Sequence, residues 1–322
     1  MKNAIIAIEP GGAFRVYLAI TNRLVAEAVR LHRTTPLATA ALGRVLTGAG
    51  LMGLMLKEPE HKLTVQFKGD GPAGEILATA AGNGEVKGYI SNPDVDLPLK
   101  APGKLDVGAA VGQGRLTVIR DTGQGEPYVG RINISTGEIA EDLTMYYFLS
   151  EQQSTAVALG VRIETDSSVG AAGGMIIQML PGASAHVTDS LETLLAQLPP
   201  FTEILHKIIT EGASLSDKAM VDRLLESIFS GLPEEYRPEI IKRCNISWHC
   251  GCSMERLEQV LLSLGREELE QMKTQDRSAE MVCQFCGKHY HFDEEHLAML
   301  LRVAVKAEEI KEKRKRAATK GI

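Results

Sequence analysis

Several signatures of enzymes are missing from this 322-residue chain. It contains no phosphate-binding loop that ends in Gly-Lys-Ser or Gly-Lys-Thr, no His-Glu-x-x-His zinc-protease motif and no Gly-x-Ser-x-Gly nucleophile elbow. No combination of Ser, His and Asp residues, and no pair of carboxylates, stands out as a catalytic group. We therefore predict that the protein is not an enzyme.

Long uncharged hydrophobic runs and an excess of positive charge are also lacking. The longest apolar stretch, residues 37–56, contains Arg44 and four glycines, so it predicts a buried helix and no membrane span. The formal net charge of −6 argues against a protein built mainly to bind nucleic acid. No secretory signal is recognisable after Met1, and we expect a cytoplasmic protein whose thiols are reduced.

The first 180 residues alternate between strand and helix patterns. Helices are expected at residues 36–56 and 140–149. Apolar and polar residues alternate, with the period of a half-buried strand, at residues 63–67, 85–90, 115–119 and 128–134. The sequence predicts an α+β fold class, with an N-terminal mixed α/β core in which helices pack on a sheet.

From Asp189 the pattern changes to that of helices. In three successive segments, apolar residues recur with the spacing of one helix face. These positions are Leu191, Leu194, Leu195 and Leu198, then Ile204, Leu205, Ile208 and Ile209, and finally Val221, Leu224, Leu225, Ile228 and Phe229. Ser216 or Asp217 can cap the third helix. Because so short a segment cannot build a large core alone, we expect an amphipathic helical linker that rests on its neighbours.

Four of the five cysteines form two close pairs, Cys250 with Cys252 and Cys283 with Cys286. Four thiolates complete the tetrahedral shell of one Zn²⁺ ion, which takes sulfur readily. We therefore predict a Zn²⁺ site with these four residues as ligands. The spacing fits either a structural zinc knot or a thiol switch built from one.

Other residues near the pairs are weaker candidates. His249, His289 and His291 could replace a ligand, but four sulfurs already fill the shell, so we interpret them as residues beside the site. Cys244 is either an unpaired bystander thiol or an alternative disulfide partner.

These patterns divide the chain into three expected domains. Residues 1–182 form the α/β core, residues 183–243 the linker, and residues 244–322 a zinc-binding domain with a C-terminal helix and a basic tail. Within the last domain, helices are expected from Ser253 to about Leu264 and from Asp293 onward.

A comparison of the free energies from burial and from metal binding predicts the role of the metal in folding. A segment of about 80 residues with a thin core gains only ~3–5 kcal/mol from burial, whereas a structural zinc contributes about 10–16 kcal/mol. Folding of the last domain is therefore expected to depend on the metal. Oxidants convert a thiolate to a sulfenic acid that condenses with a nearby thiol, which makes Cys250–Cys252 and Cys283–Cys286 the expected disulfides.

A purely structural zinc ribbon in a nucleic-acid-associated protein is the alternative. It is suggested by the basic run Lys311–Arg316, although such a run is more typical of a solvated helix end. The segment from Gly69 to Gly74 matches Gly-x-Gly-x-x-Gly, but Pro72 and the short segment that follows favour a β-turn over a dinucleotide site.

Several motifs besides the cysteine pairs carry a resemblance to a known family. They are Gln66-x-x-Gly69-Asp70-Gly71-Pro72, Glu126-Pro127-Tyr128-x-Gly130, Tyr147-Phe148-x-Ser150-Glu151-Gln152, and Gly173-Gly174 followed by Gln178-x-Leu180-Pro181. Over nearly its whole length the chain resembles the 33 kDa chaperonin family, redox-regulated heat-shock holdases of the bacterial cytosol.

The resemblance implies how such a protein works. The reduced form, with Zn²⁺ on the four cysteines, is inactive. Oxidation forms the two disulfides, expels the zinc and unfolds the zinc domain and linker. The opened protein, commonly a homodimer, then binds unfolded or misfolded proteins without ATP. Neither nucleic acid nor membrane is an expected partner. Cys244 and the tail after about Lys306 lie outside the family pattern.

Overall fold

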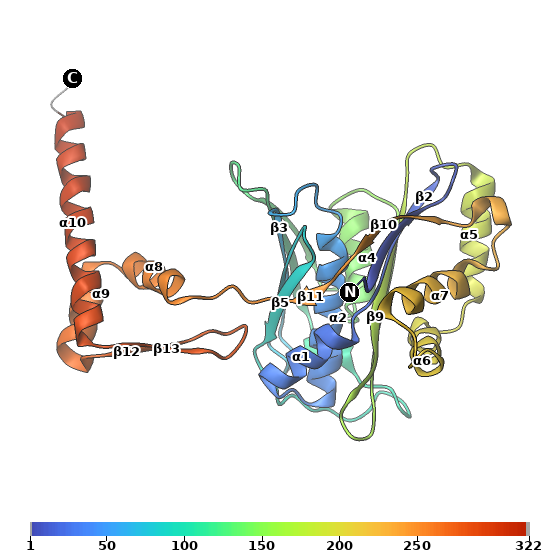
Figure 1. Cartoon of the computed structure of the whole chain (residues 1–322), viewed down its shortest axis with the longest axis horizontal. Helices are drawn as coiled ribbons and strands as arrows, with labels where there is room; N and C mark the ends of the chain where they lie inside the picture. The colour runs from blue at the N-terminus through green and yellow to red at the C-terminus, as the bar shows by residue number, and fades with distance from the viewer. Residues whose placement is uncertain (1, 320–322) are drawn as a thin grey trace. The chain divides into compact units, whose positions relative to one another are not determined.

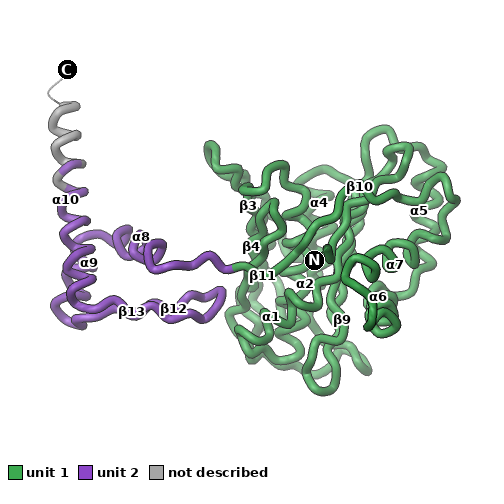
Figure 2. The backbone as a smooth tube through the Cα atoms, viewed as in Figure 1, with its two compact units in different colours: residues 1–249 green, residues 250–322 purple. Residues whose placement is uncertain are grey.

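The computed structural model describes the backbone of residues 2–319 and the side chains of residues 2–308 and 310. The chain forms two compact units, Met1–His249 and Cys250–Ile322 (Figures 1 and 2). The side chains of the basic run Lys311–Arg316 lie outside the described residues.

The first unit contains a six-stranded sheet in the order β11-β5-β4-β3-β6-β7. Neighbouring strands are antiparallel except β11 and β5, which run parallel. The strands are β3 (Lys62–Gly69), β4 (Glu75–Ala81), β5 (Glu85–Ile90), β6 (Gly114–Asp121), β7 (Tyr128–Asn133) and β11 (Ser247–Trp248). All four strands predicted from alternating polarity belong to this sheet and are confirmed.

The Gly-x-Gly-x-x-Gly segment is a tight connection between β3 and β4, as predicted. No helix begins there, and Gly74 has a φ of +66°, which glycine adopts readily. A Cβ atom on Gly69 would lie 1.9 Å from the carbonyl oxygen of Val111. Glycine at this position therefore permits a close approach of two backbone segments.

A second, five-stranded sheet has the order β10-β1-β2-β9-β8, with all neighbours antiparallel. It consists of β1 (Ala4–Ile8), β2 (Phe14–Ile20), β8 (Thr155–Ile163), β9 (Val169–Met179) and β10 (Glu239–Cys244). The α+β class is confirmed, and the strands of the core divide between two sheets.

Helix α2 (Pro36–Gly53) packs against both sheets (Figure 1). Thr35 caps it by accepting a hydrogen bond from the Ala38 N–H at 3.2 Å. Its small residues let a sheet come close to the helix, since a Cβ on Gly53 would lie only 2.9 Å from the Cβ of Ala80 on β4. The buried helix predicted at residues 36–56 is confirmed, and it ends at Gly53.

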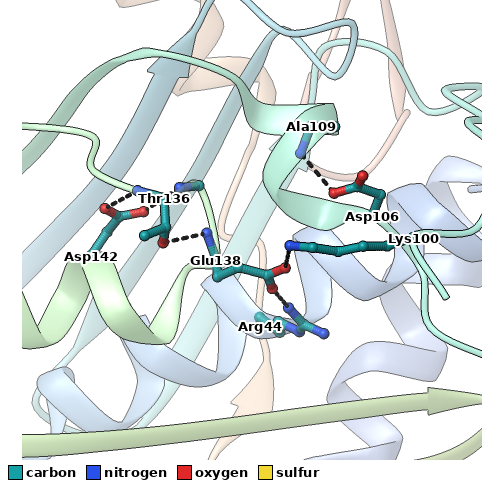
Figure 3. A network of polar contacts seen from close by, with 8 residues as sticks. Arg44, Lys100, Asp106, Ala109, Thr136, Glu138 and Asp142 are labelled. Atoms are coloured by element: carbon teal, nitrogen blue, oxygen red, sulfur yellow. Dashed lines mark hydrogen bonds and ion pairs between the residues drawn. The ribbon is translucent and has the colours of Figure 1, made fainter.

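The shorter helices of this unit are α1 (Asn22–His32), α3 (Val107–Val111) and α4 (Ala140–Leu149), the last as predicted. A polar network anchors the loop before α4 to α2 (Figure 3). Arg44 of α2 pairs with Glu138 at 2.8 Å, and both side chains are largely buried. The buried carboxylate of Asp142 accepts the backbone N–H groups of residues 135–137 at 2.6–3.2 Å, which offsets its loss of water.

Three helices cover the other face of the five-stranded sheet: α5 (Ala185–Gln197), α6 (Phe201–Glu211) and α7 (Asp217–Phe229). Alternation along β2 produces this arrangement, because Tyr17 belongs to the core around α2 whereas Val16 and Leu18 belong to the core under the three helices. The three predicted helices are confirmed, and Ser216 caps α7. They lie within the first unit, and a separate linker domain stays a prediction.

A strap, residues 239–248, follows the short helix η1 (Glu234–Tyr236) and connects both sheets. Its β10 pairs with β1 and its β11 with β5. Between them, the Asn3 side chain accepts from the Ile246 N–H at 2.8 Å and donates to the Ile246 carbonyl at 2.9 Å. The strap leads to Cys250, the first residue of the second unit.

The second unit contains a hairpin of β12 (Ala279–Val282) and β13 (His289–Phe292). Its helices are α8 (Met254–Leu264), α9 (Arg266–Gln271), the π-helical turn η2 (Met272–Asp276) and α10 (Glu294–Thr319). The two predicted helices are confirmed. The small core consists of Leu261, Leu269, Cys283, Tyr290, Phe292, Leu297, Leu300 and Ala304. None of the helices in the described part of the chain combines the length and hydrophobicity needed to cross a bilayer.

Candidate metal centre

Two loops of the second unit carry the four predicted ligands. Cys250 and Cys252 precede α8, whose first turn is fixed by Ser253 accepting from the Arg256 N–H. Cys283 and Cys286 lie in the turn between β12 and β13. The hairpin register, with hydrogen bonds from the Cys283 N–H to the Lys288 carbonyl and from the Gly287 N–H to the Cys283 carbonyl, folds this turn tightly.

The fold brings the four sulfurs together. All four Sγ atoms lie within 4.8 Å of one another, and the Cys250–Cys283 and Cys252–Cys286 pairs are separated by 3.7 and 3.4 Å. These separations exceed the ~2.03 Å of a disulfide bond. They are near the edge of about 3.8 Å expected for four sulfurs at 2.3 Å from one tetrahedral ion. The cluster can therefore hold a metal ion.

The predicted histidines are not members of this cluster in the described residues. His289 Nδ1 lies 2.7 Å from a carboxylate oxygen of Glu280, and His249 Nε2 lies 3.9 Å from Glu85. The His291 side chain is exposed on β13.

Tyr290 is a functional candidate that sequence reasoning missed. Its hydroxyl donates a hydrogen bond to Cys252 Sγ at 3.1 Å from within the small core. The sequence could have pointed to Tyr290 because it lies four residues after Cys286, in a strand. Strand polarity alone, however, does not show which side chain contacts a sulfur.

In the metal-free cluster, the pKa values of Cys252 and Cys286 differ. Burial opposes ionisation of Cys252, but hydrogen bonds from the Tyr290 hydroxyl and the neighbouring thiols outweigh it and lower the pKa of Cys252 to about 7. Burial and the hydrogen bonds among the thiols raise the pKa of Cys286 to about 12. Of these two thiols, Cys252 therefore ionises more readily, which makes it the better candidate for attack on an oxidant.

We expect the Tyr290→Phe substitution to raise the pKa of Cys252 in metal-free, reduced protein, because the thiolate loses its only phenolic donor in the described residues. The pH dependence of iodoacetamide alkylation at Cys252, followed by mass spectrometry, measures this shift. Tyr236→Phe, which changes a tyrosine of the first unit, is the control. An unchanged alkylation profile in Tyr290→Phe would refute the role of this hydroxyl.

Cys244 belongs to the other unit. It is buried in β10 opposite Ala4, and burial raises the pKa of its thiol. In the reduced protein we expect iodoacetamide to modify Cys244 at least about tenfold more slowly than it modifies the same thiol in denaturant. If Cys244 reacts equally fast in both states, β10 is not held in the sheet.

A family model described as "Hsp33 protein" matches residues 3–293. The chain belongs to this family. It is 44% identical over 302 residues to the 33 kDa chaperonin of Alkaliphilus oremlandii, a match that covers 93% of this chain and 96% of that protein.

Other relatives agree. The 33 kDa chaperonin of Clostridium tetani is 41% identical over 293 residues, which cover 91% of this chain and 95% of that one. The crystal structure of the Hsp33 homologue from Thermotoga maritima superposes with a TM-score of 0.80 at 32% identity, covering 95% of this chain and 100% of that chain. The resemblance derived from sequence motifs is confirmed.

Proposed function

We propose that the protein is a cytoplasmic, ATP-independent holdase chaperone that is activated by oxidation. Membership of the Hsp33 family supports a heat-shock chaperone. One observation supports regulation by oxidation: two loops far apart in sequence place four cysteine sulfurs within 4.8 Å of one another.

In the reduced state, Cys250, Cys252, Cys283 and Cys286 would act as the ligands. Bound Zn²⁺ supplies a tetrahedral crosslink between the two loops. The small core of the second unit supports this role, because burial alone gives such a segment only ~3–5 kcal/mol. The ordered second unit would keep the strap and the helices that precede it in place.

Oxidation by hydrogen peroxide would remove the ligands in pairs. A thiolate attacks one peroxide oxygen, which gives a sulfenic acid and hydroxide. A neighbouring thiol then attacks the sulfenic sulfur, and the disulfide forms with loss of water. Each disulfide thus requires one molecule of hydrogen peroxide, which accepts one electron from each of the two sulfurs. We assign Cys250–Cys252 and Cys283–Cys286 to these bonds.

The shortest sulfur contacts join the two loops instead, Cys250 to Cys283 and Cys252 to Cys286. Because the sulfurs of a compact cluster are all near one another, every pairing starts from a similar distance. The pairings differ in their consequence. A bond between loops, across 33 or 34 positions, would keep the second unit crosslinked, whereas bonds within the pairs restrict the chain little and let it open.

Opening would expose the surfaces that bind clients. Helices α5 to α7 bury apolar faces against the five-stranded sheet, with Leu205, Leu224 and Ile228 among the residues with least exposure. Detached, these faces form large apolar patches of the kind that bind unfolded proteins or a second copy of the chain. We therefore propose unfolded or misfolded proteins as partners and a homodimer as the oxidised state.

Light scattering from a heat-denatured client protein tests the proposal. The peroxide-treated protein should suppress aggregation, the reduced zinc form should not, and reduction with added zinc should reverse the activity. Zinc release and a mass-spectrometric disulfide map accompany the assay. Equal protection by both forms would refute the switch, and disulfides between the two loops would refute the assigned pairing.

The zinc-ribbon alternative for a nucleic-acid-associated protein gains no support. Its basis was the run Lys311–Arg316, whose side chains lie outside the described residues.

A further inference from the structure

A cavity of about 200 Å³ lies in the first unit, lined by residues of both sheets and the C-terminal end of α2. Met52, Leu63 and Val118 form part of an apolar wall. Arg15, Gln153 and Gln178 contribute polar groups from the five-stranded sheet and the segment before it. None of these residues belongs to the cysteine site.

Arg15 has no counter-ion in the part of the chain that the structure describes. Its Nε atom is buried and has no hydrogen-bond partner in the described part of the chain. Its Nη1 atom reaches only the Tyr17 hydroxyl, at a long 3.4 Å. Among described residues its guanidinium makes no ion pair, so a charge removed from much of the solvent is left uncompensated.

Three further groups could donate hydrogen bonds to a ligand. Gln178 lies opposite Arg15 in the β2–β9 register, so the two side chains share one face of the sheet. Gln153 and Gln178 are half-buried, and their carboxamides make no hydrogen bond to the described residues. Tyr147 is 5% exposed and donates only to the thioether sulfur of Met55, a weak acceptor. Burial raises the pKa of Tyr147, which keeps its proton in place.

The carboxylate that lines the cavity, Glu151, already accepts hydrogen bonds from the protein. Both carboxylate oxygens of Glu151 accept from Arg120 Nη2 at 2.6 Å, and one also accepts from the Tyr146 hydroxyl. Next to it, Gln152 adopts a φ of +53°, a conformation uncommon for residues other than glycine, as the chain turns to place Gln153 at the cavity. Such strain is often found where a fold positions a binding group.

We propose that this cavity binds a small organic carboxylate. Its oxygens would accept hydrogen bonds from Arg15, Gln153 and Gln178, and its apolar body would lie against Met52, Leu63 and Val118. A guanidinium fork matches a planar carboxylate, which offers acceptors and needs no donor. The apolar wall would leave oxygens of inorganic phosphate unsatisfied. The cavity is smaller than the about 300–1,000 Å³ typical of sites for drug-sized ligands.

Titration of the full-length, reduced protein with sodium benzoate tests this proposal. We expect saturable shifts of the Gln153 and Gln178 side-chain amide resonances in NMR spectra. Benzyl alcohol, with the same ring but no charge, and inorganic phosphate should each bind at least about tenfold more weakly. No saturation with benzoate, or equal binding of benzyl alcohol or phosphate, would overturn the proposal.

Substitutions locate the site. Arg15→Gln should weaken benzoate binding at least about tenfold, and Gln178→Met, similar in volume but without donors, should weaken it with less risk to the fold. Arg115→Gln on the exposed face of β6 is the matched control and should bind like wild type. Wild-type affinity in Gln178→Met, or in a folded Arg15→Gln protein, would place benzoate elsewhere and refute the site.

Discussion

Replacing Cys283 by Ser should leave the second unit without metal and largely unfolded, even in fully reduced protein. A hydroxyl is a poor substitute for a thiolate ligand, and structural zinc contributes about 10–16 kcal/mol of apparent binding energy at neutral pH. The core around Tyr290 and Leu297 is too small to replace that contribution. Zinc content and limited proteolysis, with the cleavage sites mapped by mass spectrometry, measure the effect.

Cys244→Ser is the matched control, since it changes a buried cysteine that lies in the other unit. It should keep one equivalent of zinc and the wild-type protease resistance of residues 250–308. If Cys283→Ser also keeps both, the four-sulfur assignment is wrong. If metal-free wild type is equally resistant, the metal does not order this unit.

Replacing Leu224 by Ala should make the reduced, zinc-loaded protein active as a holdase. Leu224 lies on α7 with no exposed surface, in the core that holds the three linker helices on the sheet. Truncating a buried leucine costs about 2–5 kcal/mol, which weakens the docking of α7 without touching a cysteine. Light scattering with a heat-denatured client under reducing conditions measures the activity.

Leu215→Ala supplies the control, because Leu215 is 39% exposed just before α7. It should leave the reduced protein inactive, and both variants should retain zinc. If Leu224→Ala lowers the thermal stability of the first unit but stays inactive when reduced, release of α7 is not the activating step. The assignment of the four cysteines as metal ligands does not depend on this result.

The cysteine cluster was predictable from sequence because its chemistry requires few residue types. Pairs such as Cys283 with Cys286 are local, and a tetrahedral metal tolerates many paths of the chain between the pairs. The linker helices were equally accessible, since the stripe from Val221 to Phe229 repeats with the period of a helix. Both signals lie within short segments.

Other features depend on partners that the sequence does not identify. Alternating polarity predicted strands such as β3 and β6, but it does not say that the strands divide between two sheets around α2. The hydroxyl of Tyr290 meets Cys252 only because the hairpin lies against the loop before α8. In the same way, Cys244 is buried in the first unit because β10 pairs with β1.

Local patterns were enough to predict the fold class, the amphipathic helices and the four cysteines that come together, because hydrophobic periodicity and thiol spacing are properties of neighbouring residues. The tertiary fold sets the difference in pKa between Cys252 and Cys286, the surface on which helices α5 to α7 dock, and the position of Arg15, which has no counter-ion among the described residues. These depend on burial and on contacts between residues such as Arg15 and Gln178, which lie far apart in the chain and meet only when the sheets form.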